Sequence, residues 1–362
     1  MSEQATDSGD SGLTGADTRQ AEFEVHNKGV LGHIQHALHV NPTLVPVIIL
    51  LLSVAVFYVA TDGKLLTGLA IKVTLEQTAI VGILACAQTL VILTAGIDLS
   101  VGAVMVLSYV AMGHLAVTYG VPTPLAIIGG MLVAMLCGLA NGLLVTRLRL
   151  PPFIVTLGTW RIVLATVFLY TGSQSIRSQD IDAEAPALKF FGERAELFGL
   201  QFKIMGVPQI WALVLMIGVF VVGWYVLHRT AWGRHVYAVG DDAPAAELAG
   251  VATSRVLISV YVVAGAVCGL AAWAAIGRVG SISPSSFAEA NLESIAAVVI
   301  GGTSLFGGRG TILGTLFGAL TVGVFTTGLK LAGADPQWVL FASGCLIIVA
   351  VAIDQWIRRV SS

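Results

Sequence analysis

Two short polar stretches interrupt long apolar sequence, and they carry the side chains whose types and spacing could do chemistry. LTAGIDLSVGAV, residues 93–104, holds Asp98 and Ser100, and IGGTSLFGGRG, residues 300–310, holds Thr303 and Ser304. An acid inside a membrane segment is costly, so Asp98 marks a functional site by default. The alternative for Asp98 or Ser100 is structural, because either side-chain oxygen can cap a helix start by accepting a free backbone amide.

The sequence contains no catalytic constellation. Ser304 lies in GTSLFG, which lacks the GxSxG spacing of a serine hydrolase, and no HExxH metal motif occurs. A GxxxxGK(S/T) phosphate loop is also absent, so the chain is not expected to bind ATP by that device. We therefore expect no enzyme, metal or cofactor. Four cysteines lie far apart in apolar runs, which predicts small buried side chains rather than disulfides or metal ligands: Cys86, Cys137, Cys268 and Cys345.

Composition places these stretches inside a membrane protein. The 362 residues are 56% hydrophobic and 11% charged, with a mean hydropathy of +0.88 and a net charge of -2. A soluble domain devotes about a quarter of its residues to charge, so this chain cannot cover itself with a wetted surface. Long apolar runs without sustained alternation favour helices over barrel strands. The expected fold class is an all-α integral membrane protein, and a nucleic-acid partner is not expected.

The first 43 residues differ in composition from the rest. Residues 1–24 are polar, acidic and rich in Ser, Gly and Asp, which predicts a disordered tail rather than a cleavable signal peptide. His33, His36 and His39 follow at three-residue spacing. They could bind a metal, but an interfacial helix lying on the membrane is favoured. We expect residues 1–43 to form a cytoplasmic tail and this interfacial helix.

Apolar runs bounded by charge, Pro or Gly predict about ten transmembrane helices, some of them short or broken. The expected spans are residues 44–60, 77–95, 99–118, 123–146, 152–171, 209–227, 256–277, 291–302, 311–330 and 336–353. Together they make one transmembrane domain over residues 44–355. The longest connection, 172–208, is expected to fold as a small extramembrane element.

Basic residues in the short connections predict the orientation. Seven arginines fall on one side when the spans are counted in order: Arg147, Arg149, Arg229, Arg234, Arg255, Arg358 and Arg359. Because basic loops are retained in the cytoplasm, both termini and the 229–255 connection are expected there, and 172–208 outside. Four basic residues in the external loop count against this orientation: Arg177, Lys189, Arg194 and Lys203.

Glycines indicate where the chain leaves the helix. Each costs about 1 kcal/mol relative to alanine in a helix interior, and five crowd into ten residues: Gly301, Gly302, Gly307, Gly308 and Gly310. A break between two helices is therefore predicted, with Thr311 or Ser304 capping the next helix. Gly96 ends the apolar run before Asp98. Gly310, Gly314 and Gly318 recur every four residues, which predicts that they share one helix face and allow another helix to pack closely there.

The connection RTAWGRHVYAVGDDAPAAELAGVATSR, residues 229–255, contains the signals of a short helix. Asp242 can cap it, Pro244 suits its first turn, and Gly250 can end it. The helix would expose alanines and a leucine on the cytoplasmic side. This helix could dock a partner or could simply connect two spans, and the residues favour neither role.

Three segments together resemble one protein family. LTAGIDLSVGAVM, AVGDDAPAAELAGV and LESIAAVVIGGTSLFGGRGTILGTLFGAL are similar to the permease subunits of bacterial ABC importers for monosaccharides, of the ribose, xylose, galactose and fructose type. The similarity runs over residues 44–355 with order and spacing preserved. Before the first span, GHIQHALHVNP faintly resembles fructose permeases.

The resemblance implies a homodimer in the bacterial inner membrane, a separate cytoplasmic ATP-binding subunit, and a periplasmic sugar-binding protein that delivers a monosaccharide for alternating access. It matches the short helix to a coupling loop that sits on the ATPase, with residues Asp241, Asp242, Pro244, Ala245, Ala246, Glu247 and Gly250. A neutral sugar needs hydroxyl or amide hydrogen bonds rather than ion pairs. The candidate path or gate residues are Asp98, Ser100, Asn141, Thr303 and Ser304, and helix-to-helix hydrogen bonding is the structural alternative for Asn141.

Three other hypotheses stay open. An ion-coupled secondary transporter would need a titratable pair near the midplane, and Asp98 with Glu76 or Glu293 is the candidate, although both glutamates lie near predicted span ends. An ABC permease for another small polar solute, such as a branched-chain amino acid, would share the architecture, but the GIDLS pattern favours sugar. A passive channel would need no partner ATPase.

Overall fold

The computed structural model describes residues 43–197 and 199–361, with the backbone alone at 350 and 353–361. The tail, the interfacial helix and the three histidines expected near the N-terminus lie outside the described residues. The described chain forms helices and two short hairpins: α2 (Leu44–Ala60), η1 (Lys64–Leu66), α3 (Gly68–Leu93), α4 (Val101–Gly113), η2 (His114–Thr118), α5 (Thr123–Arg147), α6 (Pro152–Thr171), α7 (Ser178–Glu184), η3 (Pro186–Gly192), β1 (Glu196–Leu197), β2 (Leu200–Gln201), β3 (Lys203–Ile204), β4 (Val207–Pro208), α8 (Trp211–Arg229), α9 (Ala231–Asp241), α10 (Ala243–Leu248), α11 (Thr253–Val279), α12 (Ala290–Ile300), α13 (Ile312–Leu331) and α14 (Pro336–Ser361).

The all-α membrane fold is confirmed. Seven described helices are long and apolar enough to cross a membrane, with η2 extending α4 into one of them, and three shorter apolar helices accompany them, α2, α12 and the apolar part of α14. The main difference from the predicted spans is α3, which begins at Gly68 instead of residue 77. Thr67 caps it by accepting the Ala70 amide, and Lys72 pairs with Glu76 at 3.7 Å inside its first turns. These two charged residues lower the local hydropathy, so by hydropathy the apolar run begins after them.

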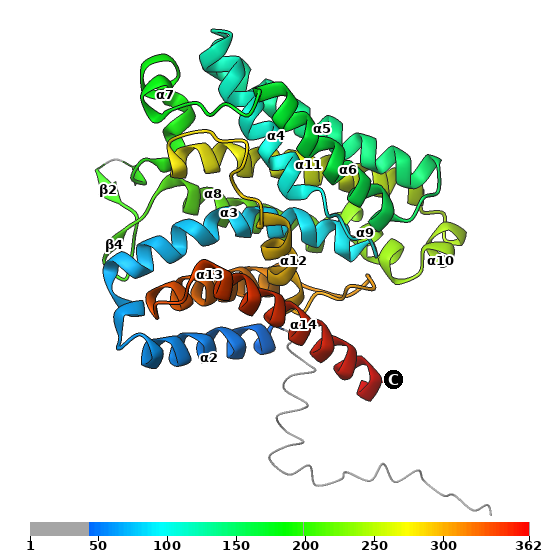
Figure 1. The fold of residues 1–362 in the computed structure, drawn as a ribbon. Helices are drawn as coiled ribbons and strands as arrows, with labels where there is room; N and C mark the ends of the chain where they lie inside the picture. The colour runs from blue at the N-terminus through cyan, green and yellow to red at the C-terminus, as the bar shows by residue number, and fades with distance from the viewer. Residues whose placement is uncertain (1–42, 198, 362) are drawn as a thin grey trace, which may run out of the picture. The chain divides into compact units, whose positions relative to one another are not determined.

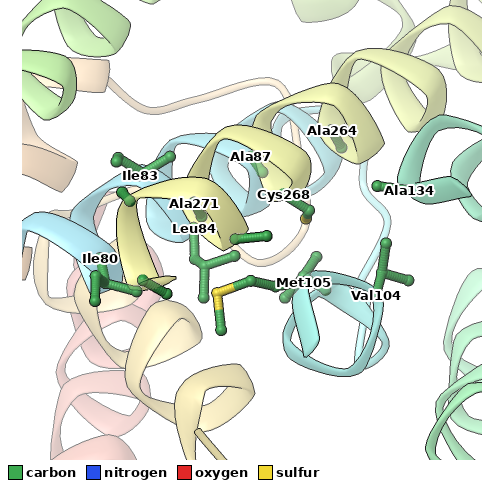
Figure 2. Close-up of a cluster of buried hydrophobic side chains, with 14 of the residues drawn as sticks. Ile80, Ile83, Leu84, Ala87, Val104, Met105, Ala134, Ala264, Cys268 and Ala271 are labelled. Atoms are coloured by element: carbon green, nitrogen blue, oxygen red, sulfur yellow. The ribbon is translucent and has the colours of Figure 1, made fainter. Parts of the chain in front are cut away.

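Helix α3 forms the centre of the core. It is apolar on every side, which is typical of a helix buried among others, and it packs against α8, α11, α12 and α13. Figure 2 shows Ile83, Leu84 and Ala87 of α3 beside the small residues of α11 and Met105 of α4. Because the α11 side chains here are alanines and a cysteine, the helices approach closely.

Helices α5 and α11 approach each other closely along their backbones. A Cβ added at Gly138 would lie 2.2 Å from the Tyr261 carbonyl oxygen, and one at Gly265 would lie 2.4 Å from the Ala134 carbonyl oxygen. Backbone atoms cannot move aside as a flexible side chain can, so glycine is required on both helices. This interface fixes α11 against α5 and holds Tyr261 next to the break that follows α3.

The cysteines only partly follow the prediction. Cys86 and Cys268 are buried, Cys137 is half-buried and Cys345 is exposed, and none of the four is in a disulfide. The prediction of buried side chains is therefore wrong for Cys345, which lies on the outward face of α14.

The helices run back and forth between two ends of the bundle (Figure 1). At one end lie α9 and α10, the close of α3, the break before α13, the start of α2 and the close of α14. At the other, which we call the hairpin end, α7, η3 and the hairpins β1–β2 and β3–β4 fill the connection from α6 to α8. The expected extramembrane element at 172–208 and the short helix in 229–255 therefore lie at opposite ends.

Candidate functional site

The first polar stretch is a structured break between α3 and α4. Helix α3 ends with Ala95 in the left-handed conformation, φ 60°, while the Gly96 amide donates to the Val91 carbonyl at 3.1 Å. This is the pattern of a Schellman helix end. The chain then runs outside a helix to Ser100, the last residue before α4.

Asp98 stabilises this break rather than capping a helix. It is 4% exposed, and its Oδ1 accepts the Ser100 amide at 2.7 Å and the Ser100 hydroxyl at 2.6 Å. The Ser100 side chain makes no cap bond to α4. The prediction that Asp98 or Ser100 caps the next helix is thus wrong, because the two side chains bind each other.

Side chains from α5 and α6 fix the break from one side. Asn141 Nδ2 donates to Ser100 Oγ at 2.9 Å, and Thr156 Oγ1 donates to the Ile97 carbonyl at 2.9 Å. Asn141 therefore holds the break instead of joining two helices. Among the described residues its Oδ1 has no hydrogen-bond partner, and neither does the buried hydroxyl of Tyr261. Two polar groups are thus left for water or a polar solute.

Asn291, in the first turn of α12, clamps the break from the other side. Its Oδ1 accepts the Gly102 amide at 2.5 Å, and its Nδ2 donates to the Leu99 carbonyl at 2.6 Å. It satisfies a free amide at the start of α4, which is the task expected of Asp98 or Ser100. Sequence analysis missed it, because an asparagine at the start of a span gives no signal of a partner 189 residues away.

The second polar stretch is a tight turn between α12 and α13. The Ser304 amide donates to the Arg309 carbonyl at 2.9 Å, and the Gly307 amide donates to the Ser304 carbonyl at 3.1 Å. Thr311 caps α13 by accepting the Gly314 amide at 3.0 Å, whereas Ser304 Oγ accepts the Phe306 amide within the turn. Of the two predicted caps, only Thr311 is confirmed.

The glycines of this stretch divide into two groups. Gly314 and Gly318 face α12, where an added Cβ would lie 2.1 Å from the Gly301 carbonyl oxygen or 1.9 Å from that of Ala297. Gly310 precedes α13, so it does not share their helix face as predicted. Gly302, Gly307 and Gly308 have φ of 77°, 84° and 69°, which favours glycine.

The two breaks meet each other and α9 at a contact of backbones that we call the glycine junction, formed by Leu93, Gly240, Gly307 and Gly308. The Gly308 amide donates to the Leu93 carbonyl at 3.0 Å. A Cβ at Gly240 would lie 1.7 Å from the Leu93 oxygen, and one at Gly307 would lie 2.6 Å from the Gly240 oxygen. The end of α3, the end of α9 and the second break are therefore in direct backbone contact.

Two further contacts tie α9 to the second break. A Cβ at Gly308 would lie 2.7 Å from the Asp241 Cα. Tyr237 Oη donates to the Gly310 carbonyl at 3.0 Å, and burial raises the pKa of this hydroxyl, so it stays protonated as a donor. Helix α9 and the second break are therefore in direct contact at both positions.

The predicted short helix is confirmed as α10. Asp242 Oδ1 accepts the Ala245 amide at 3.0 Å, Pro244 lies in the first turn, and Gly250 follows the helix with φ 86°. Ala246 faces inward, whereas Ala245 and Glu247 are exposed and Leu248 is 92% exposed. Leu248 therefore leaves almost its whole apolar side chain uncovered.

The candidate path residues form two groups. Asp98, Ser100 and Asn141 are joined by hydrogen bonds, whereas Thr303 and Ser304 belong to the second break, and no described hydrogen bond links the groups. Thr303 Oγ1 is buried without a hydrogen-bond partner among the described residues. Among the described residues the groups are linked through the backbone contacts of the glycine junction and through α12, whose first turn holds the first break by Asn291 and whose last residue borders the second.

An acidic pair around Asp98 is not observed in the described part of the chain. Glu76 lies well inside α3, contrary to the predicted span end, and pairs with Lys72. Glu293 lies in the first turn of α12. Among the described residues no group of three or more His, Cys, Asp or Glu side chains could hold a metal ion.

Comparisons with known proteins identify the family. Residues 70–351 match the family model described as branched-chain amino acid transport system / permease component. The chain is 55% identical to the fructose import permease protein FrcC of Rhizobium meliloti, over 97% of this chain and 95% of that protein. It is 37% identical to the ribose import permease protein RbsC of Bacillus subtilis, over 78% and 83% of the two chains, and 30% identical to the xylose transport system permease protein XylH of Haemophilus influenzae, over 85% and 96%. No solved structure matches the chain. With most of its length matched by the model and by such relatives, the chain belongs to this family of transport-system permease components.

Proposed function

We propose that this chain is the membrane permease of an ATP-driven importer that moves a monosaccharide into the cell, and that the sugar is fructose. The observation that carries the proposal is 55% identity along almost the whole chain to a protein named as a fructose import permease. Relatives named for ribose, allose and xylose are 37%, 32% and 30% identical to the chain. An amino acid is disfavoured as the substrate, since these relatives are sugar permeases.

ATP hydrolysis belongs to a separate cytoplasmic subunit in this proposal. The sequence has no phosphate loop of its own. Helix α10 offers the docking element, because Leu248 projects from a helix whose start is fixed by Asp242. A periplasmic sugar-binding protein docks at the opposite, hairpin end, and the permease acts as a homodimer.

This assignment sets the orientation in the inner membrane. The α9–α10 end faces the cytoplasm, where Arg147, Arg149 and Arg255 follow the rule that basic connections stay inside. The start of α2 and the close of α14 lie at the same end, so both termini are cytoplasmic. The hairpin end then faces the periplasm.

Alternating access follows from the contacts at the cytoplasmic end. A pull on α10 is transmitted to α9, and the glycine junction passes it to the end of α3 and to the second break. Both breaks then move as one gate. A neutral sugar crosses with hydrogen bonds to unpaired groups such as Asn141 Oδ1, Thr303 Oγ1 and the Tyr261 hydroxyl.

Removal of the exposed leucine of α10 tests the coupling. We expect Leu248→Ala to reduce about tenfold both the amount of ATPase that copurifies with the permease and the sugar uptake, since burial of a leucine side chain against a partner contributes about 1.5 to 3 kcal/mol. Leu148→Ala is the matched control, because Leu148 is 61% exposed at the same end but lies outside α9 and α10. If Leu148→Ala weakens the complex and Leu248→Ala does not, α10 is not the docking element.

The proposed sugar is tested by uptake in cells that contain the chain and its two partners. Labelled fructose is expected to enter, and excess unlabelled ribose, xylose or galactose is expected to compete poorly. Preferential uptake of one of those three sugars would overturn fructose while leaving the importer intact.

A further inference from the structure

A cavity of about 240 Å³, lined by charged and apolar side chains, lies between the hairpin end and the first break. Its polar lining comes from Gln77 on α3, Arg278 in the last turn of α11, and Glu289 and Glu293 at the start of α12, with the Phe287 ring beside them. Gln77 is nine residues inside α3, about 13 Å from its outer end at 1.5 Å per residue. The cavity therefore reaches inward from the periplasmic surface.

The polar groups of this cavity are not paired with one another. The ion pairs among the described residues are Lys72 with Glu76 and Lys189 with Asp182, so Arg278 has none although it is half-buried. In the described part of the chain neither the Gln77 side-chain amide nor the Glu293 carboxylate takes part in a hydrogen bond. Arg278 and Glu293 lie near enough for their charges to attract each other, but they form no ion pair, and both line a space that a solute can enter.

The chemistry of the lining selects a neutral polyhydroxy solute. The Arg278 guanidinium only donates hydrogen bonds, the two glutamates only accept them, and the Gln77 amide does both. Sugar hydroxyls both donate and accept, so one ring can satisfy all of them, with its C–H face on Phe287. A sugar is uncharged, so it enters the cavity without the desolvation cost that an ion would carry. The volume lies below the ~300 to 1,000 Å³ of pockets for drug-sized ligands, which fits a single sugar ring.

The geometry points to an entry subsite that receives the monosaccharide from the binding protein before it reaches the gate; this inference rests on the proposed sugar import. Helix α12 connects the two sites, because its first turn carries Glu293 into the cavity and its last residue, Ile300, borders the second break. The same first turn carries Asn291, which holds Leu99 and Gly102 of the first break. A sugar in the cavity thus contacts the helix that positions both breaks.

Neutralisation of the lining tests the subsite in the complete transporter, reconstituted in liposomes with ATPase and fructose-loaded binding protein. We expect Glu293→Gln and Arg278→Gln each to reduce fructose uptake about tenfold, while ATP hydrolysis stimulated by the binding protein stays within twofold. Asp62→Asn is the matched control, since Asp62 is an exposed acid in a turn at the same end, and its uptake should equal that of the wild type. Uptake at the wild-type level in both cavity variants would overturn the subsite.

Saturation-transfer NMR tests the subsite without the other subunits, so it applies even if a variant permease does not assemble with the ATPase. Fructose added to the detergent-solubilised full-length permease, without binding protein, is expected to receive saturation from the wild-type protein and not from Glu293→Gln. No transfer from the wild-type protein would overturn the subsite. If instead the wild-type transporter moves no fructose although transfer is observed, the proposed function fails and the sugar site stands.

Discussion

Replacement of Gly240 by alanine is expected to reduce sugar uptake by at least about a hundredfold. The new Cβ would lie 1.7 Å from the Leu93 oxygen and 2.7 Å from the Gly308 nitrogen. Both are backbone atoms, so no rotamer change relieves the clash, and α9 must separate from the two breaks. Backbone shifts of this kind place the cost at the upper end of single substitutions, about 4 kcal/mol or more. Uptake in cells and the yield of folded protein in detergent measure the effect.

Gly218→Ala is the control for this variant. Gly218 is an exposed glycine of α8 with no atom within 4 Å of an added Cβ. Alanine there should leave uptake unchanged and stabilise the helix by about 0.5 to 1 kcal/mol. Normal transport by Gly240→Ala would mean that the backbones at the junction separate readily, and that transmission through them is not required.

The second large effect is expected for Asn291→Ala. Among the described residues its side chain is the one partner of the Gly102 amide and of the Leu99 carbonyl, at 2.5 Å and 2.6 Å. Each buried group left unpaired costs about 1 to 3 kcal/mol, so the loss of both partners should destabilise the break between α3 and α4 by about 2 to 6 kcal/mol. We expect uptake to fall about thirtyfold, with faster hydrogen exchange in residues 96–104, measured by mass spectrometry.

Ser294→Ala separates the clamp from a general weakening of α12. Ser294 lies one turn further along and is buried, but its hydroxyl donates only to the Asn291 carbonyl within the same helix. Its removal should change uptake less than about threefold, because no distant group loses a partner. Equal losses in the two variants would show that α12 packing, and not the clamp, limits transport.

Local signals in the sequence predicted most of the elements. Apolar runs located the helices, crowded glycines located the second break, and Asp242 with Pro244 located α10, because each depends on residues close together in the chain. The start of α3 was missed because Lys72 and Glu76 interrupt the apolar run while pairing on the helix surface. Hydropathy cannot distinguish such a pair from the end of a span.

The site was predicted in its parts but not in its assembly. The polar stretches were found, yet the partners of Asp98 were not, since Ser100 bonds to it directly and the cap of α4 comes from Asn291. The glycine junction brings together residues 93, 240 and 308, and nothing local to any of them indicates the others. Contacts between distant segments follow from the packing of whole helices, which residue types alone do not specify.

Uptake of labelled fructose by cells carrying this chain, its ATPase and its binding protein tests the central claim most directly when the normal ATPase is compared with a variant unable to hydrolyse ATP. The proposed importer predicts uptake with the normal ATPase and none above background with the inactive one. Uptake that persists without hydrolysis would contradict ATP-driven import, and would direct attention to an ion gradient acting through Asp98.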